Sequence, residues 1–278
     1  MVMIPAPIVP APERLRRRYG LFDAASGPLD FPAHGEGGGV RFQPLECGRA
    51  YAYGVACYGS GEGQTPAPSK PLDQGNDEVS TGVFAVLATV NCGSVGYSDE
   101  EFRTQARRRL EGNEQAAVEA AFWGGEDFQG NSLDILDLNG TAEDVDPGYD
   151  PGLITDVVGA LERYAYTEQG YGGVAYIHAP IEVAAFAAEA GLVLPESNSP
   201  TARKITPLGS VWAFGAYPAG SIIVTGQTTV WRSAEIVVHN SFDQNTNEVL
   251  MVAERAYSVA YECFAGRAEF DPLEVTSP

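Results

Sequence analysis

The chain has 278 residues, 44% of them hydrophobic, which is enough apolar surface for one large domain or two closely joined ones and excludes extensive disorder. The formal net charge of −20 and the pI near 4.4 exclude a protein that holds nucleic acid or anionic lipid by charge. No run of about 18 apolar residues occurs, so we expect no membrane-spanning helix.

Residues 1–45 are rich in proline and include the glycine-rich segment 35–39. This composition is typical of an extended arm that becomes ordered only against neighbouring structure. The apolar stretch at its start precedes the basic residues, which is the reverse of the order in a secretory signal peptide. The charge cluster of the arm is either a solvated turn of helix or a contact to an acidic surface of a neighbour; its members are Arg14, Arg16, Arg17 and Arg18.

Two apolar segments flank a polar stretch at 59–80 that is rich in glycine and proline. Residues 46–58 alternate aromatic and small side chains, and residues 81–95 are rich in Val, Phe and Thr, so both segments predict strands of a long hairpin. A two-stranded ribbon is marginally stable alone in water. Its apolar side chains therefore need a partner surface, in this subunit or another, and we expect adjoining copies to cover them; they are Val83, Val86, Leu87 and Val90.

Residues 98–123 predict a long amphipathic helix. Ser98 and Glu101 have the spacing of a capping box, and the pair Gly124-Gly125 ends the helical pattern. The apolar stripe consists of Phe102, Ala106, Leu110, Ala117, Val118, Ala121 and Phe122. We expect the remaining, solvated side to carry Arg103, Arg107, Arg108, Glu111, Glu114 and Glu119.

The acidic segment 126–150 does not match the spacing of an EF-hand, so we expect a solvated loop and no calcium site. From residue 151 onward, helical and strand patterns alternate, which predicts a compact α/β unit. Its expected elements are a helix at 151–170, a strand at 172–178, a helix from Pro180 to Gly191, and strands at 206–218, 221–227 and 228–239. Residues 241–270 could form a long strand or a helix, and the alternating Tyr and Val side chains at 257–261 favour the strand.

Motifs of catalysis are missing from the sequence. There is no GxSxG, no Walker loop, no GxGxxG after a strand and no HExxH around the three histidines, which are His34, His178 and His239. The four cysteines lack CxxC spacing, and we interpret them as reduced, mostly buried thiols; they are Cys47, Cys57, Cys92 and Cys263. We therefore expect no catalytic, cofactor-binding or metal-binding residues, and an assembly role instead of turnover.

The order of the pieces is an extended arm, a long hairpin, a long helix, an α/β unit and a terminal long strand. This order resembles the major capsid proteins of tailed phages, which have the Hong Kong 97 fold, and those of actinobacterial phages in particular. The likeness spans roughly residues 46–270, and the segments that carry it are 110–125, 172–193, 206–218 and 242–263.

The resemblance implies an α+β fold with four parts. Residues 1–45 would be the N-terminal arm, and residues 46–97 an extended loop that lies across a neighbouring subunit. Residues 98–151 and 236–278 would form the peripheral domain, which contains the spine helix, and residues 152–235 the axial domain around the five- or six-fold axis.

The resemblance also implies a structural protein, not an enzyme, that self-assembles as hexamers and pentamers into the icosahedral head shell of a tailed double-stranded DNA phage. Portal, scaffold and decoration proteins would be further partners, and DNA would be packaged without specific binding. Its place would be the virion capsid, assembled in the cytoplasm of a bacterial host. Some members of the fold join subunits covalently, and here the candidate residues are Lys70 with Asn240, Asn245 or Asn247.

Two alternatives stay open. The first is an encapsulin-like shell that surrounds a cargo enzyme, which would use the same fold. The second is a small α/β hydrolase whose nucleophile is Ser210 or Cys263 and whose base is His178 or His239.

Overall fold

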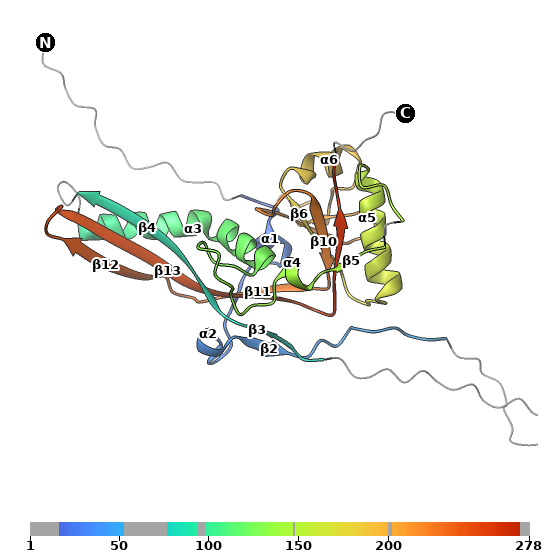
Figure 1. Ribbon diagram of the computed structural model, residues 1–278, viewed down its shortest axis with the longest axis horizontal. Helices are drawn as coiled ribbons and strands as arrows, with labels where there is room; N and C mark the ends of the chain where they lie inside the picture. Colours follow the sequence, from blue (N-terminus) through green and yellow to red (C-terminus); the bar gives the residue numbers. More distant parts are fainter. Residues whose placement is uncertain (1–16, 53–76, 94–97, 147, 200–201, 273–278) are drawn as a thin grey trace, which may run out of the picture.

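The computed structural model describes residues 17–52, 77–93, 98–146, 148–199 and 202–272. Figure 1 shows an elongated molecule with two parts. One part is a long ribbon of strands beside helix α3 (Asp99–Gly124), and the other is a compact sheet flanked by α5 (Ile154–Arg163) and α6 (Val183–Glu189).

The ribbon is part of a five-stranded sheet centred on the long strand β13 (Glu248–Tyr261). Strand β4 (Phe84–Gly93) pairs antiparallel with one edge of β13. On the other edge, β12 (Val237–Asp243) pairs with the first half of β13 and β11 (Thr228–Arg232) with the second half. The short β1 (Leu29–Asp30) pairs parallel with β11. The strand prediction for the C-terminal segment is therefore confirmed.

Helix α3 begins at the predicted capping box. The Ser98 Oγ accepts the N–H of Glu101 at 3.3 Å, and the Glu101 carboxylate accepts the N–H of Ser98 at 2.7 Å. The Ser98 N–H, and after it the Ser98 hydroxyl, which donates to the same carboxylate at 2.8 Å, hold the pKa of the Glu101 carboxyl below its usual value. The helix ends at Gly125, whose φ of 66° is the left-handed conformation of a glycine C-cap.

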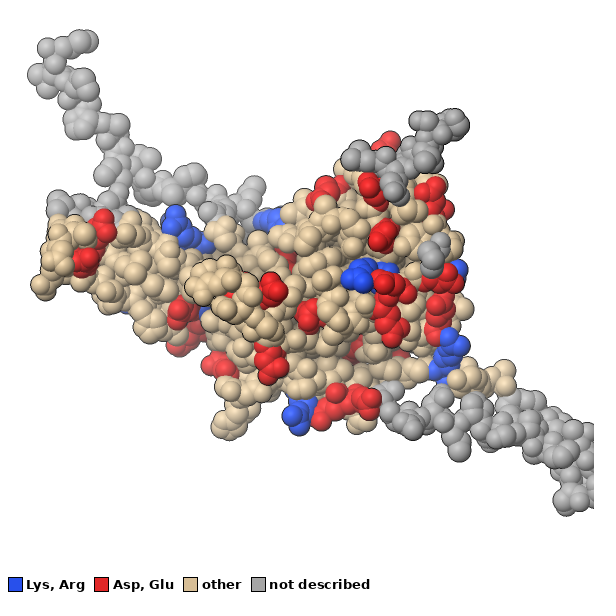
Figure 2. Space-filling view, in the orientation of Figure 1, with Lys and Arg blue, Asp and Glu red and all other residues tan. Residues whose placement is uncertain are grey.

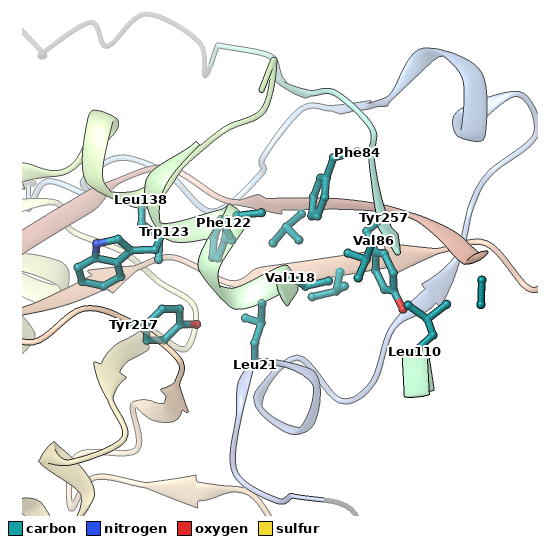
Figure 3. Close-up of a cluster of buried hydrophobic side chains, with 14 of the residues drawn as sticks. Leu21, Phe84, Val86, Leu110, Val118, Phe122, Trp123, Leu138, Tyr217 and Tyr257 are labelled. Atoms are coloured by element: carbon teal, nitrogen blue, oxygen red, sulfur yellow. The ribbon is translucent and has the colours of Figure 1, made fainter. Parts of the chain in front are cut away.

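One face of the ribbon is covered by α3. Figure 3 shows the apolar side chains of α3 and of strands β4 and β13 meeting in a single buried cluster. The helix contributes Phe102, Ala106, Leu110, Val118 and Phe122, and the strands contribute Phe84, Val86, Val90, Met251, Ala253 and Tyr257. Burial of each Val, Leu, Phe or Met side chain among them stabilises the packing by about 1.5–3 kcal/mol, which makes this cluster the main support of the ribbon.

The second sheet has seven strands in the order β5-β14-β10-β6-β9-β8-β7. Its central strands β6 (Tyr176–Pro180) and β9 (Val211–Gly215) are parallel and fully buried. The remaining strands are β5 (Glu143–Asp144), β7 (Leu194–Pro195), β8 (Lys204–Ile205), β10 (Ser221–Thr225) and β14 (Ala265–Glu269).

Helix α5 packs on this sheet, and the four residues predicted to face inward, Val157, Val158, Leu161 and Tyr164, are all buried in its core. A π-helical turn, η1 (Tyr164–Glu168), continues α5. Helix α6 is followed by Gly191 at a φ of 72°, as a glycine-terminated helix predicts. The short α4 (Leu138–Thr141) connects the region after α3 to β5.

The N-terminal segment does not behave as the sequence suggests. The expectation of an arm ordered only against neighbours is wrong for residues 17–45, while residues 1–16 lie outside the described part. Helix α1 (Leu21–Ala24) places a fully buried Leu21 in the core beneath α3, and Ala24 packs with residues of the seven-stranded sheet. The segment continues into α2 (Gly35–Gly38) and β2 (Val40–Phe42).

The expected hairpin is also corrected. Residues 46–52 form no strand, and residues 53–58 lie outside the described part of the chain. Strand β3 (Val79–Thr81) pairs with β2, and β4 pairs with β13 of the same subunit. Because α3 covers the inner face of β4, Val86 and Val90 are buried within their own subunit, so adjoining copies are not needed to cover them.

The chain passes between the two sheets at places that differ from the expected domain boundaries. Strand β11, inside 152–235, belongs to the five-stranded sheet. Strand β14, inside 236–278, and strand β5, inside 98–151, belong to the seven-stranded sheet. For β14 the reason is that it follows β13 through a tight turn at Cys263 but pairs with the other sheet.

Candidate functional site

Glu114 lies on the inner side of α3, although the sequence suggested a solvated position. It is 4% exposed, and its carboxylate accepts hydrogen bonds from Arg232 at 3.0 Å, Arg255 at 3.1 Å and the Tyr257 hydroxyl at 2.6 Å. Burial, and after it the bond to Glu114, raises the pKa of Tyr257. This Glu114 cluster ties the middle of the helix to β11 and β13.

Glu119 is a second buried carboxylate on α3, and it too was expected in solvent. One oxygen accepts the Leu21 N–H at 3.0 Å and Gln115 Nε2 at 2.8 Å, and the other accepts the Ala216 N–H at 2.8 Å and a bond from Arg17. Glu119 therefore joins α3, the N-terminal segment and the turn between β9 and β10. Arg17, one of the two described members of the arginine cluster, makes this contact inside its own subunit.

A sequence signal for Glu114 existed. The residues buried on α3 recur every four positions at 102, 106, 110, 118 and 122, and position 114 completes that series. A carboxylate at a position of an apolar series is buried only if other buried groups pair with it, and Glu114 has three such partners. The partners themselves lie more than 100 residues away and could not be read from the spacing.

The outer face of the ribbon, opposite α3, is open and partly apolar. Its side chains lie in cross-strand rows, of which Val237–Glu254–Leu87 and Ser241–Leu250–Asn91 are two. Val237 is 51% exposed, Leu87 43% and Leu250 39%. We call these three residues, with the strand faces around them, the outer ribbon face. Polar and apolar side chains are mixed on this face, since Glu254 lies between Val237 and Leu87, and such a mixture is also found in non-obligate protein contact surfaces.

The two cysteines Cys47 and Cys263 form a disulfide with a Cα–Cα distance of 5.3 Å, so the expectation of reduced thiols is wrong for this pair. The bond links the segment after β2 to the turn between β13 and β14, across a sequence separation of 216 residues. The pairing depends on tertiary structure, and no spacing motif could have indicated it.

The candidate bases His178 and His239 and the candidate nucleophiles do not form a catalytic arrangement, and His239 lies on the ribbon, 3.9 Å from Glu254. His178 is fully buried between Tyr217, Thr225 and Thr228, which lie 3.1–3.3 Å from its ring nitrogens, and burial lowers its pKa to about 3. Ser210 instead bonds Glu162 at 2.7 Å. Cys263 is in the disulfide, so it is no free nucleophile, and the geometry supports a structural role for His178.

The acidic segment after α3 is an ordered loop. Asp127 accepts hydrogen bonds from the Asn131 side chain and from the N–H groups of Asn131 and Gln129, and these bonds, the side-chain bond first, hold the pKa of its carboxyl low. The loop exposes 83% of Phe128 at its tip. Within the described residues, no group of three or more His, Cys, Asp or Glu side chains could hold a metal ion, and no helix could span a bilayer.

The candidate cross-linking residues are only partly described. Lys70 lies outside the described residues. Asn240 donates to Asp99 at 3.3 Å on the α3 side of the ribbon, and Asn245 and Asn247 lie in and beside the turn between β12 and β13. The covalent cross-link stays a prediction.

No protein-family model and no curated protein matches this chain. Solved structures do: the capsid of an empty GTA particle matches with a TM-score of 0.54 and 13% identity, over 96% of this chain and 95% of that chain. The structure titled Mycobacterium phage Ogopogo matches with a TM-score of 0.53 and 14% identity, over 96% of this chain and 97% of that chain. The structure titled Microbacterium phage Oxtober96 matches with a TM-score of 0.50 and 11% identity, over 96% of this chain and 95% of that chain.

The chain has the Hong Kong 97-like capsid fold. The matches cover nearly all of both chains, so the likeness concerns the whole fold and not one of its two sheets. The predicted α+β fold class is thereby confirmed. At identities near one in eight, the likeness establishes the fold, and the function is argued separately below.

Proposed function

We propose that this chain is the structural major capsid protein of a tailed double-stranded DNA phage, assembling as hexamers and pentamers into an icosahedral head shell. The fold supports this, because it covers nearly the whole length of proteins from capsids and phages. The single observation that carries the proposal within the molecule is the outer ribbon face, where apolar residues are exposed on a sheet whose other face is packed.

The two sheets would have different places in the shell. The five-stranded sheet with α3 would form the peripheral domain, and the seven-stranded sheet the axial domain near the local symmetry axis. The sheet pairings favour boundaries that assign β11 to the peripheral domain and β5 and β14 to the axial domain. The chain between β2 and β3, together with these strands, would be the extended loop that lies across a neighbour.

The charge of the chain suits a container for DNA. In the view of Figure 2, acidic side chains are spread over the surface and basic ones are few. A wall with a net charge of −20 would repel the phosphate backbone, so packaged DNA would not adhere to it. Portal, scaffold and decoration proteins would be further partners, and assembly would take place in the cytoplasm of the bacterial host.

The alternatives fare less well. The neighbours reported above come from phage and GTA particles, and they do not favour an encapsulin-like compartment. A hydrolase would need Ser210 or Cys263 next to a histidine, and these side chains have other partners. We therefore propose no enzymatic activity.

Negative-stain electron microscopy of the purified full chain tests the proposal. We expect closed, uniform shells or their hexamer and pentamer building blocks, since many modest contacts sum to a stable assembly when the symmetry closes. A chain that stays monomeric at high concentration under all assembly conditions would overturn the proposed function.

A further inference from the structure

The turn that carries Cys263 connects the two sheets of the molecule. It lies between the last residue of β13, in the five-stranded sheet, and the first residues of β14, in the seven-stranded sheet. Cys263 has a φ of 65°, a left-handed conformation that glycine normally supplies and that is unfavourable for other residues. A cysteine at such a position indicates that its sulfur has a role there.

Among the described residues, the segment that Cys47 belongs to makes few other hydrogen bonds to the rest of the molecule. The Glu46 carbonyl accepts the Gly172 N–H at 3.5 Å, and Arg49 donates to the Glu168 carbonyl at 2.8 Å. Glu46 and Arg49 are exposed, and Leu45 before them is 86% exposed. A segment with few buried contacts opens locally at little cost unless a covalent bond holds it.

Two carboxylates also oppose this contact. Glu262 precedes Cys263, and its pKa is raised first by burial and then by the nearby Glu46 carboxylate, against the hydrogen bond from Tyr171. Like charges on the two linked segments repel each other. The disulfide therefore joins two segments whose carboxylates Glu46 and Glu262 repel each other.

We propose that the Cys47–Cys263 disulfide is a redox-operated clamp, which fixes residues 46–49 to the β13–β14 turn when oxidised and releases them when reduced. Both cysteines are partly exposed, so small thiols and disulfides can reach them. The clamp acts within one subunit and does not require the proposed capsid function. Only the timing of the clamp rests on that function: in a phage shell it would be open in the reducing cytoplasm and closed after the particle leaves the cell.

The chemistry is a thiol–disulfide exchange with a small-molecule disulfide such as oxidised glutathione. One cysteine thiolate attacks the external disulfide, forming a mixed disulfide and expelling one glutathione thiolate; the second cysteine thiolate then displaces the other. The protein pair loses two protons and two electrons, and the external disulfide gains them as two thiols. No other oxidant is needed.

Limited trypsin digestion of the full chain reports the state of the clamp. Between Arg41 and Arg103 the only basic residues are Arg49 and Lys70, and Lys70 precedes Pro71, a bond that trypsin cleaves poorly. Cleavage after Arg49, followed on reducing gels, thus measures how often residues 46–49 detach. We expect the rate to be at least about tenfold higher in protein treated with dithiothreitol, removed before digestion, than in protein treated with oxidised glutathione.

Two controls make the result decisive. The double variant Cys57→Ser/Cys92→Ser should keep the full difference in cleavage, whereas Cys47→Ser/Cys263→Ser should be cleaved at the fast rate after either treatment. Alkylation of the oxidised, denatured wild type should modify two of its four cysteines. Equal cleavage rates of oxidised and reduced wild type, or four alkylated cysteines after oxidation, would overturn the proposal, and neither outcome bears on shell formation.

Discussion

The two sheets of this molecule differ in how many of their faces are buried. Strands β6 and β9 of the seven-stranded sheet are buried on both faces and, apart from His178, contain only apolar, aromatic or small residues. Along β4 and the first part of β13 in the ribbon, more buried and more exposed side chains alternate, because α3 covers one face of the sheet and the other face is open. The apolar residues of the seven-stranded sheet therefore stabilise the subunit, whereas those of the outer ribbon face are available for contacts between subunits.

The largest effect should come from breaking the Glu114 cluster. Glu114→Ala leaves Arg232, Arg255 and Tyr257 without their shared acceptor, and removing one partner of a buried ionic cluster costs about 3–5 kcal/mol. Urea unfolding measures the loss, and amide hydrogen exchange should rise in β11 and β13 more than in β6 and β9. Glu111→Ala, on the exposed side of the same helix, should change stability by less than about 0.5 kcal/mol.

A matched pair of truncations sharpens the comparison of the sheets directly. Ile222→Ala removes a fully buried side chain from β10 and should lower the free energy of unfolding by about 2–4 kcal/mol. Leu87→Ala, on the outer ribbon face, should cost the isolated subunit less than about 1 kcal/mol, because 43% of Leu87 is exposed. Equal losses for the two variants would show that the outer ribbon face is part of the subunit core.

His178 makes the seven-stranded sheet sensitive to acid. Its pKa is lowered by burial to about 3, so below its ordinary value near 6.5 the unfolded chain binds a proton that the folded chain does not. The contribution of the neutral His178 to the free energy of unfolding is therefore fully present above about pH 6.5. It is lost at up to about 1.4 kcal/mol per pH unit as the pH falls towards 3.

The variant His178→Gln isolates this effect from the many carboxylates of the chain. Glutamine offers a donor and an acceptor to Thr225, Thr228 and Tyr217 but does not titrate. The difference in unfolding free energy between wild type and variant, measured at several pH values, should change across this window. A difference that is independent of pH would contradict a neutral buried His178.

The smallest effect concerns the start of α3. Ser98→Ala removes the side-chain acceptor of the capping box and should cost about 1 kcal/mol. Ser241→Ala, on the exposed outer ribbon face, should be neutral for the subunit and serves as the control in thermal melting. If both serines behave alike, the cap makes no net contribution.

Local features of the fold could be predicted from the sequence, and pairings could not. The helix from Ser98 to Gly125, the inward face of α5 and the long terminal strand follow from capping chemistry and periodicity. That β4 is a strand could be read, but not that β13 is its partner about 160 residues away. The same limit applies to Glu114, Glu119 and the Cys47–Cys263 bond, whose partners are brought together only by the tertiary structure.

Sedimentation velocity of wild type and of Leu87→Arg/Leu250→Arg tests most directly whether the outer ribbon face joins subunits. The arginines make the acidic chain less negative, so a loss of assembly could not come from greater charge repulsion. We expect the wild type to form large assemblies and the variant to remain as small species with an unchanged melting temperature. A folded variant that assembles as the wild type does would contradict the assignment of this face to subunit contacts.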